Sequence, residues 1–130
     1  MRLSVGIDIV AVGDVAESIR VHAERYLNRV YSRSELEDCA RPGGGHDPAR
    51  LAARFAAKEA TMKALRVADE AVPWNAISVV RDAHGRPSLR LHGPAAALAG
   101  ERGVGGLEVS LTHEGPFAAA VVLAQSGGAS

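Results

Sequence analysis

Two hydrophobic periodicities alternate along the 130-residue chain, and each predicts a different kind of element. Strict alternation of apolar and polar residues predicts a half-buried strand at 107–112. Short runs rich in β-branched and apolar residues, bounded by turn residues, predict further strands at 5–10, 76–81, 88–91 and 117–124. Short turns separate 76–81 from 88–91 and 107–112 from 117–124, so we expect two antiparallel hairpins.

The helical period is strongest at 48–67, where Asp47 is placed to cap the longest helix of the chain. Asp14 is expected to cap a first helix, and Ser32 and Glu35 have the spacing of a capping box that opens a short one. These shorter helices are predicted at 15–27, 32–40 and 93–103. The glycine-rich segment between the second and the longest helix is predicted to be a loop.

The order of predicted elements is strand, three helices, two strands, helix, two strands. This order favours an α+β domain with a largely antiparallel sheet packed against one long helix. The length fits one domain, with no linker or internal repeat. We expect that domain to cover residues 1–124 and a flexible tail to follow at 125–130.

Composition narrows the function. Fifteen basic and fifteen acidic side chains give no net charge, which argues against nucleic acid as a partner. No apolar run approaches the ~20 residues that cross a bilayer, and the first residues do not resemble a signal peptide. The single cysteine, Cys39, excludes an internal disulfide and a cysteine-based zinc site. We therefore expect a cytoplasmic enzyme or binding domain with no membrane partner.

Asp8 is the first candidate for chemistry. It interrupts the apolar strand at 5–10, and Gly6 just before it allows another backbone or a ligand to come close. The alternative is that Asp8 faces solvent on a half-exposed strand, which strand alternation also permits.

The long helix carries the second candidate group, at the edge of its apolar stripe. The two lysines of the chain, Lys58 and Lys63, both lie there with Glu59 and Arg54, whereas the other basic residues are all arginines. A charge at a buried face must be paired or bound to a ligand. The alternatives are an ordinary Glu59–Lys63 surface pair and a lysine whose stem alone is buried.

Thr112 and His113 form the third candidate, at the end of the strand at 107–112, a usual place for functional side chains. No histidine pair has zinc-binding spacing, and the glycine run lacks the rest of a phosphate-loop motif. Carboxylates on a strand and on a helix, with lysine and arginine nearby, suit Mg²⁺ and a pyrophosphate. Residue types alone make this possible without making it specific.

Three stretches together resemble the holo-acyl-carrier-protein synthases, the small 4′-phosphopantetheinyl transferases. They are Val5-Gly6-Ile7-Asp8-Ile9-Val10, Arg54-Phe55-Ala56-Ala57-Lys58-Glu59-Ala60 with Lys63, and Val109-Ser110-Leu111-Thr112-His113-Glu114. The resemblance covers nearly the whole chain. It implies transfer of phosphopantetheine from coenzyme A to a serine of an acyl carrier protein, which releases adenosine 3′,5′-bisphosphate.

The resemblance also implies roles for particular residues. Asp8 and Glu59 match the family's magnesium ligands. Together with Lys63 they also match its catalytic residues. The coenzyme A site is implied at Arg54, Lys58, Lys63, Thr112 and His113. The general base stays open between Glu59 and a metal-bound water. A homotrimer with active sites between subunits is implied as well.

One position departs from the family. Asp14 stands where many members carry an arginine that meets the acidic carrier protein, so the resemblance does not imply docking through that contact here. The segment 20–33 holds four arginines against one glutamate and offers a replacement basic surface, or else an ordinary solvated helix face. Transfer to a carrier domain of a polyketide or peptide synthase, and a non-catalytic nucleotide- or carrier-binding module, are the alternatives to transfer to a free carrier protein.

Overall fold

The computed structural model describes residues 1–127. Its elements in chain order are β1 (Arg2–Ala11), α1 (Val12–His22), α2 (Glu24–Val30), α3 (Arg33–Asp38), α4 (Pro48–Ala64), a 3₁₀ turn (Trp74–Ala76), β2 (Ile77–Arg81), β3 (Pro87–Leu91), α5 (Gly93–Glu101), β4 (Val104–Glu114) and β5 (Phe117–Ser126).

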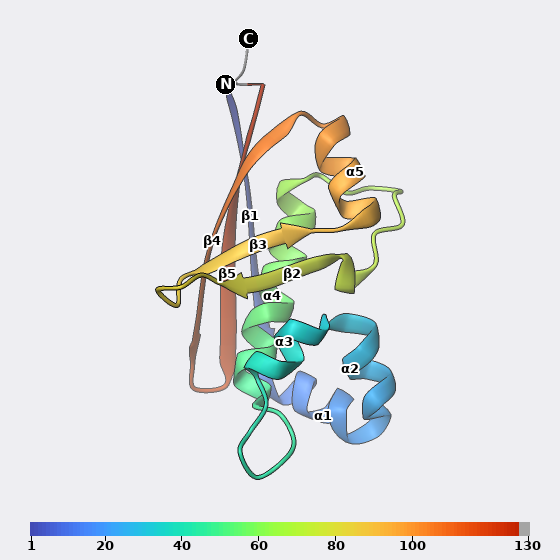
Figure 1. Cartoon of the computed structure of the whole chain (residues 1–130), viewed down its shortest axis with the longest axis vertical. Helices are drawn as coiled ribbons and strands as arrows, with labels where there is room; N and C mark the ends of the chain where they lie inside the picture. Colours follow the sequence, from blue (N-terminus) through green and yellow to red (C-terminus); the bar gives the residue numbers. More distant parts are fainter. Residues whose placement is uncertain (128–130) are drawn as a thin grey trace.

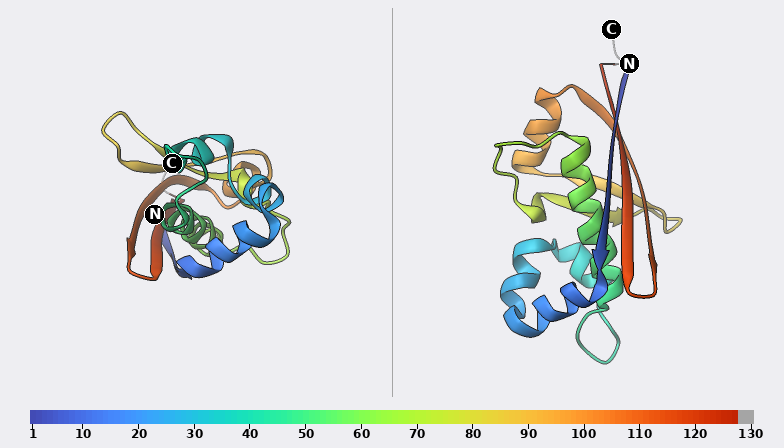
Figure 2. Two further views of the ribbon diagram at one scale, coloured as in Figure 1. Left: turned by 90° about the horizontal axis from the view of Figure 1, so that it is seen from below. Right: turned by 180° about the vertical axis from the view of Figure 1, so that it is seen from behind.

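The long helix α4 forms the centre of the molecule. The antiparallel sheet β1-β5-β4 packs along one side of it, and the β2-β3 hairpin with α5 covers another side (Figure 1). Helices α1, α2 and α3 gather around its N-terminal end, and α4 is enclosed when the molecule is viewed along its length (Figure 2). The predicted α+β fold, an antiparallel sheet on one long helix, is confirmed.

The three-stranded sheet has two contrasting faces. Asp8 of β1 pairs with Ala120 of β5, which pairs with Leu111 of β4, so these side chains share the face toward α4. The opposite face leaves large apolar side chains exposed. They are Leu3, Val5, Ile7, Ile9, Phe117, Val121 and Leu123. An exposed apolar surface of this kind marks an interaction site.

The first predicted helix differs from the observed structure. It begins at Val12 and is broken at Ala23, whose φ of 47° and ψ of −125° separate α1 from α2. Asp14 therefore lies inside the first turn and does not cap the helix. A side-chain cap is not needed at Val12, because β1 leads directly into α1 and the Val12 N–H donates to the Pro116 carbonyl at 2.9 Å.

Two predicted boundaries also differ. Helix α4 ends at Ala64 instead of residue 67, and Arg66 follows with a positive φ of 58°. Strand β5 continues into the predicted tail, because Gln125 and Ser126 pair with the start of β1. The rest of the predicted tail, 128–130, lies outside the described residues.

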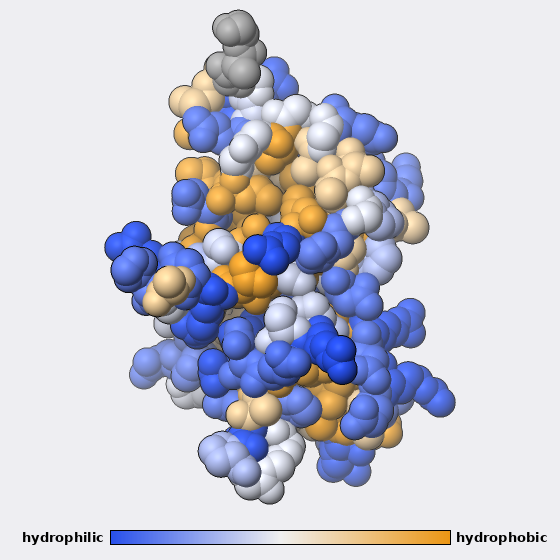
Figure 3. Space-filling view, viewed as in Figure 1, coloured by the Kyte–Doolittle hydropathy of each residue, from blue (hydrophilic) through white to orange (hydrophobic). Residues whose placement is uncertain are grey.

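The surface of the molecule differs in hydropathy from one end to the other. Hydrophilic side chains dominate the end formed by α1, α2 and α3 in the space-filling view (Figure 3). Within residues 1–127, no helix has both the length and the apolar character that crossing a membrane requires.

Candidate active site

Gly6 allows β1 and α4 to approach unusually closely. A methyl group at Gly6 would overlap the carbonyl oxygen of Ala60 and lie 2.8 Å from the backbone nitrogen of Ala64. The helix is also rich in buried alanines on this side, so no large side chain keeps the two backbones apart. This contact brings Asp8, two residues further along β1, against the turn of α4 that carries Glu59 and Lys63.

The functional consequence of this approach is testable with Gly6→Ala. The added methyl must push β1 from α4, so we expect a loss of about 1–3 kcal/mol in stability and at least about tenfold in turnover. Gly100→Ala in α5 is the matched control, since its added methyl meets no atom within 4 Å. Thermal melts and steady-state assays of both variants measure the effect; wild-type turnover of Gly6→Ala would contradict the positioning role.

A groove of about 330 Å³ opens beside this contact. Asp8 and Glu59 line it from β1 and α4, and Asp14 lines it from α1. The remaining walls are mainly apolar or aromatic. They are Ile9, Val10, Ala11, Val15, Ser18, Tyr26 and Phe55. The groove is thus a partly apolar hollow with converging carboxylates, which is the usual character of a small-molecule site.

Lys63 is the cation beside these carboxylates. Its ammonium donates to Asp8 Oδ1 at 3.1 Å and to the Ile7 carbonyl at 2.9 Å. Burial raises the pKa of Glu59, the negative charge of Asp8 raises it further, and Lys63 opposes both effects. Two carboxylates are therefore held close enough to repel each other, and a cation in the groove would relieve that repulsion.

The donor set fits Mg²⁺. This ion is held by one or two carboxylates and completes its octahedron with water and substrate phosphates, so Asp8 and Glu59 are sufficient protein ligands. Across residues 1–127, no group of three or more histidine, cysteine or acidic side chains is arranged to hold a metal ion. A Mg²⁺ ion that takes its remaining ligands from water and substrate phosphates needs no third protein ligand, in agreement with this finding.

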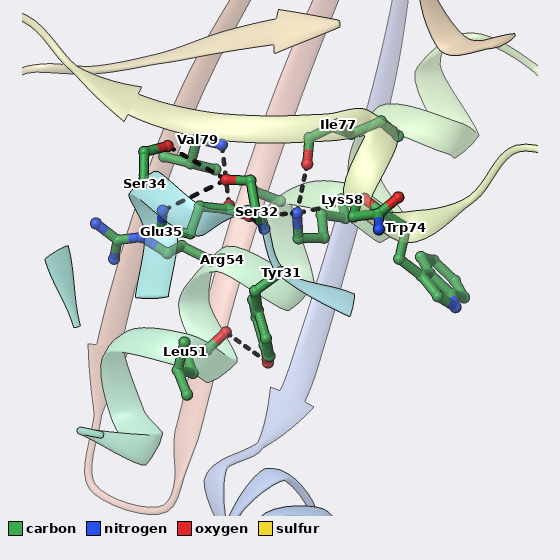
Figure 4. Close-up of polar contacts among 12 residues, drawn as sticks. Tyr31, Ser32, Ser34, Glu35, Leu51, Arg54, Lys58, Trp74, Ile77 and Val79 are labelled. Atoms are coloured by element: carbon green, nitrogen blue, oxygen red, sulfur yellow. Dashed lines mark hydrogen bonds and ion pairs between the residues drawn. The ribbon is translucent and has the colours of Figure 1, made fainter. Parts of the chain in front are cut away.

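Lys58, which the family resemblance assigns to the coenzyme A site, does not line this groove. Its side chain has no exposed surface, and its ammonium donates to Glu35 Oε1 at 2.6 Å and to the carbonyls of Ile77 and Trp74 (Figure 4). Burial lowers the pKa of Lys58, and the Glu35 carboxylate opposes that shift. Lys58 thus ties α4 to α3 and to the start of β2 and does not line the groove.

Arg54, one turn earlier, is also buried on the α3 side. Only 1% of its side chain is exposed, and it donates to Asp38 Oδ2 at 3.5 Å and to the Arg50 carbonyl at 3.4 Å. Its Nε has no hydrogen-bond partner among the described residues. Arg54 therefore does not line the groove, and its predicted contact with coenzyme A stays a prediction.

Glu35 is a buried charged residue that sequence reasoning missed. The predicted capping box is confirmed, since Glu35 Oε1 accepts from Ser32 N at 2.9 Å and Ser32 caps α3. The same carboxylate also accepts from Lys58 and from Val79 N, the latter at 3.0 Å. In the sequence, the capping box was a sufficient reason for a glutamate at position 35. No local pattern indicated its other partners, Lys58 and Val79, which are 23 and 44 residues away.

Thr112 and His113 do not join Asp8 within the chain. They lie on β4, and β5 separates β4 from β1, so the two outer strands are about 10 Å apart. His113 shares the α4-facing side with Asp8, whereas Thr112 points to the exposed apolar face with Ile9. Of the predicted residues, the structure brings together Asp8, Glu59 and Lys63.

The structure shows which arginines of the predicted basic surface, at 20–33, are paired with a carboxylate and which are not. Arg20 is held by Glu17, with contacts of 2.6 and 2.9 Å, so its charge is balanced within α1. Arg25 and Arg29 remain exposed on α2. Asp14 faces the groove itself, which the sequence did not indicate.

These features define a class: a small α+β protein whose strand and central helix bring two carboxylates into one groove and hold a lysine against one of them. The family model described as the 4′-phosphopantetheinyl transferase superfamily matches residues 4–122. The chain belongs to this superfamily.

Its relatives agree over nearly their whole lengths. A holo-[acyl-carrier-protein] synthase of Moorella thermoacetica is 45% identical over 127 residues, which cover 95% of this chain and 94% of the relative. The crystal structure of the Neisseria meningitidis holo-[acyl-carrier-protein] synthase superposes with a TM-score of 0.83 at 27% identity, covering 95% and 98% of the two chains. The Helicobacter pylori synthase in complex with coenzyme A gives 0.79 at 26% identity, covering 93% and 99%.

Proposed function

We propose that this chain transfers 4′-phosphopantetheine from coenzyme A to a serine of an apo acyl carrier protein. The observation that carries the proposal is that Asp8 and Glu59 line one groove, with Lys63 bonded to Asp8 beside it, in a chain from this superfamily. The relatives named above are synthases of this kind, and one of them binds coenzyme A.

The chemistry follows from charge and position. The serine oxygen forms a bond to the β-phosphorus of coenzyme A, the bond from that phosphorus to the bridging oxygen breaks, and adenosine 3′,5′-bisphosphate leaves. The serine hydroxyl gives up its proton, for which Glu59 is a carboxylate acceptor in the groove. Lys63 is placed to donate to phosphate oxygens and to balance their charge.

Asp8 and Glu59 would hold Mg²⁺, which when bound would neutralise the pyrophosphate and the developing charge on the leaving oxygen. Their own part is to fix the position of the pyrophosphate against β1 and α4. Phe55 and Tyr26 form the apolar part of the groove wall and exclude water from one side of it.

We propose further that the chain works as a homotrimer whose subunits meet through the apolar face of β1-β5-β4. Ile7 and Ile9 are both 66% exposed on that face, which a stable soluble monomer would not favour. Thr112 points to the same face. A neighbouring subunit packed there would bring its Thr112 against β1 of this chain, the strand that carries Asp8.

Val121→Glu tests this arrangement at the centre of the face, on β5. A buried, unpaired carboxylate opposes association, so we expect monomers and at least about tenfold lower turnover at low protein concentration. Val21→Glu is the control, because Val21 is equally an exposed apolar residue but lies on α1. Sedimentation and activity of the two variants should differ; an active, trimeric Val121→Glu protein would refute the interface.

The carrier should meet the hydrophilic end formed by α1, α2 and α3, since the groove opens beside α1 and α2. Arg25 and Arg29 are the exposed cations there that no carboxylate holds within the described residues. An acidic carrier protein fits this surface. A cytoplasmic location is proposed because both substrates of the reaction are soluble cytoplasmic molecules.

The direct test is the mass of a purified apo carrier protein after incubation with this protein, coenzyme A and Mg²⁺. A gain equal to one phosphopantetheine supports the proposal, and unchanged mass contradicts it. The same assay with an excised polyketide or peptide synthase carrier domain compares the two carrier classes.

A further inference from the structure

The ammonium of Lys58 has a complete set of partners in the interior. It carries three N–H groups, and it donates to three acceptors, Glu35 Oε1 at 2.6 Å and the carbonyls of Trp74 and Ile77 (Figure 4). Each nitrogen of a planar guanidinium carries at most two N–H groups, so an arginine could not satisfy three acceptors around one point. This difference explains a lysine here, in a chain whose other basic residues, Lys63 apart, are arginines.

A first link from Lys58 to the groove runs through Trp74. Lys58 donates to the Trp74 carbonyl at 3.3 Å, and the Trp74 indole packs on the ring of Phe55 with the two ring centroids 5.2 Å apart. Phe55 lines the groove. The segment 67–73, which leads to Trp74, contains no helix or strand, so the hydrogen bond from Lys58 is a contact that fixes Trp74 to α4.

A second link runs through Tyr31, whose ring centroid lies 5.7 Å from the Lys58 ammonium, within the range of a cation–π contact. The Tyr31 hydroxyl donates to the Leu51 carbonyl at 3.2 Å, so it has no second hydrogen to give. Tyr26 is therefore the donor in the 2.8 Å hydrogen bond that joins the two tyrosine hydroxyls. Tyr26 lines the groove, and its hydroxyl is held by the buried residue that Lys58 contacts.

Both links end on the aromatic side of the groove. The carboxylate side is placed by other contacts, the close approach of β1 and α4 at Gly6 and the bond from Lys63 to Asp8. Loss of the Lys58 contacts should therefore disturb the aromatic wall and leave the proposed metal ligands in place.

We propose that Lys58 is a positioning residue of the groove. Its ammonium holds Trp74 and Tyr31, and through them it fixes Phe55 and Tyr26 as a rigid wall against which the substrate lies during transfer. Lys58 does this from the interior, without touching the substrate. The inference rests on the proposed function, which supplies the reaction.

The test removes both members of the buried ion pair, so that neither charge is left alone. The double variant Glu35→Gln with Lys58→Met should keep the fold, because replacing a whole buried pair is often neutral for stability. We expect kcat/KM for transfer to fall about tenfold, since the wall loses its support. The Mg²⁺ concentration that gives half the maximal rate should stay as in the wild type.

Trp74 is the single tryptophan of the chain, so its fluorescence reports the first link directly. In the folded double variant we expect a red-shifted emission and stronger quenching by acrylamide than in the wild type. Trp74→Ala breaks the same link at a half-buried residue and leaves the ion pair intact. Its kcat/KM should also fall about tenfold, and this variant decides the matter if the double variant does not fold.

Leu98→Ala is the matched control for lost stability. Leu98 is buried on α5 in a separate cluster with Leu65 and Ala99, so its truncation should lower the melting temperature. At a temperature where it is folded, its Trp74 fluorescence and kcat/KM should equal those of the wild type.

Three outcomes would overturn the inference and leave the proposed function standing. They are wild-type kcat/KM in Trp74→Ala or in the folded double variant, unchanged Trp74 fluorescence in the folded double variant, and an equal loss of kcat/KM in Leu98→Ala. Absence of transfer by the wild type would instead contradict the proposed function.

Discussion

Glu59→Gln is expected to lower turnover at least about 100-fold while the fold and oligomer remain intact. Glutamine keeps the size of the side chain and loses the negative charge that would hold Mg²⁺ beside Asp8. Asp8→Asn should have the same effect, because the two carboxylates act on one ion. Initial rates measured across a series of Mg²⁺ concentrations, together with circular dichroism, provide the comparison.

Asp14→Asn is the matched control for this pair. Asp14 lines the same groove but lies on α1, outside the β1–α4 contact that brings Asp8 to Glu59. If the metal needs specific ligands, Asp14→Asn should change turnover by less than about threefold. If the groove needs only negative charge, Asp14→Asn should lower turnover as much as Asp8→Asn and Glu59→Gln do. Full activity of Glu59→Gln at ordinary Mg²⁺ would eliminate the metal assignment.

The second large effect concerns stability, at the buried pair between Glu35 and Lys58. We expect Glu35→Ala to lower the free energy of unfolding by about 3–5 kcal/mol, because it leaves the Lys58 ammonium buried without its counter-charge. The backbone N–H of Val79 also loses its acceptor. Urea unfolding at fixed protein concentration measures the change.

Glu37→Ala is the control on the same helix. Glu37 is exposed, and its 3.9 Å contact with Arg33 is a surface pair, so removing it should cost less than about 1 kcal/mol. The double variant Glu35→Gln with Lys58→Met removes both buried charges. It should therefore be more stable than a variant in which Glu35 alone is replaced. Equal midpoints for Glu35→Ala and Glu37→Ala would show that the pair contributes little.

The fold was largely predictable because its signals are local. Apolar alternation, the Asp47 cap and the Ser32–Glu35 capping box indicated most elements and their antiparallel hairpins. The break at Ala23 carried no such signal, since alanine favours a continuous helix and rarely adopts a positive φ. The end of β5 was missed because its pairing partner is the start of β1, more than 100 residues away.

The site was predictable only in part, for the same reason. Asp8, Glu59 and Lys63 were identified by a carboxylate in an apolar strand and by charges at the edge of a helix stripe, and the structure brings them together. Lys58 belongs to the same stripe, but its partner Glu35 lies on a different helix, so the sequence could not separate a buried ion pair from a substrate contact. The role of Gly6 depends on the approach of α4, which only the folded chain reveals.

The central claim is that phosphopantetheine is transferred from coenzyme A in the groove lined by Asp8 and Glu59, with Lys63 bonded to Asp8 beside it. The measurement that tests it most directly is mass spectrometry of an apo carrier protein incubated with coenzyme A, Mg²⁺ and either the wild type or Glu59→Gln. The account predicts a gain of one phosphopantetheine on the carrier serine with the wild type, and almost none over the same time with the variant or without Mg²⁺. An unmodified carrier with the wild type, or equal modification by the variant, would contradict it.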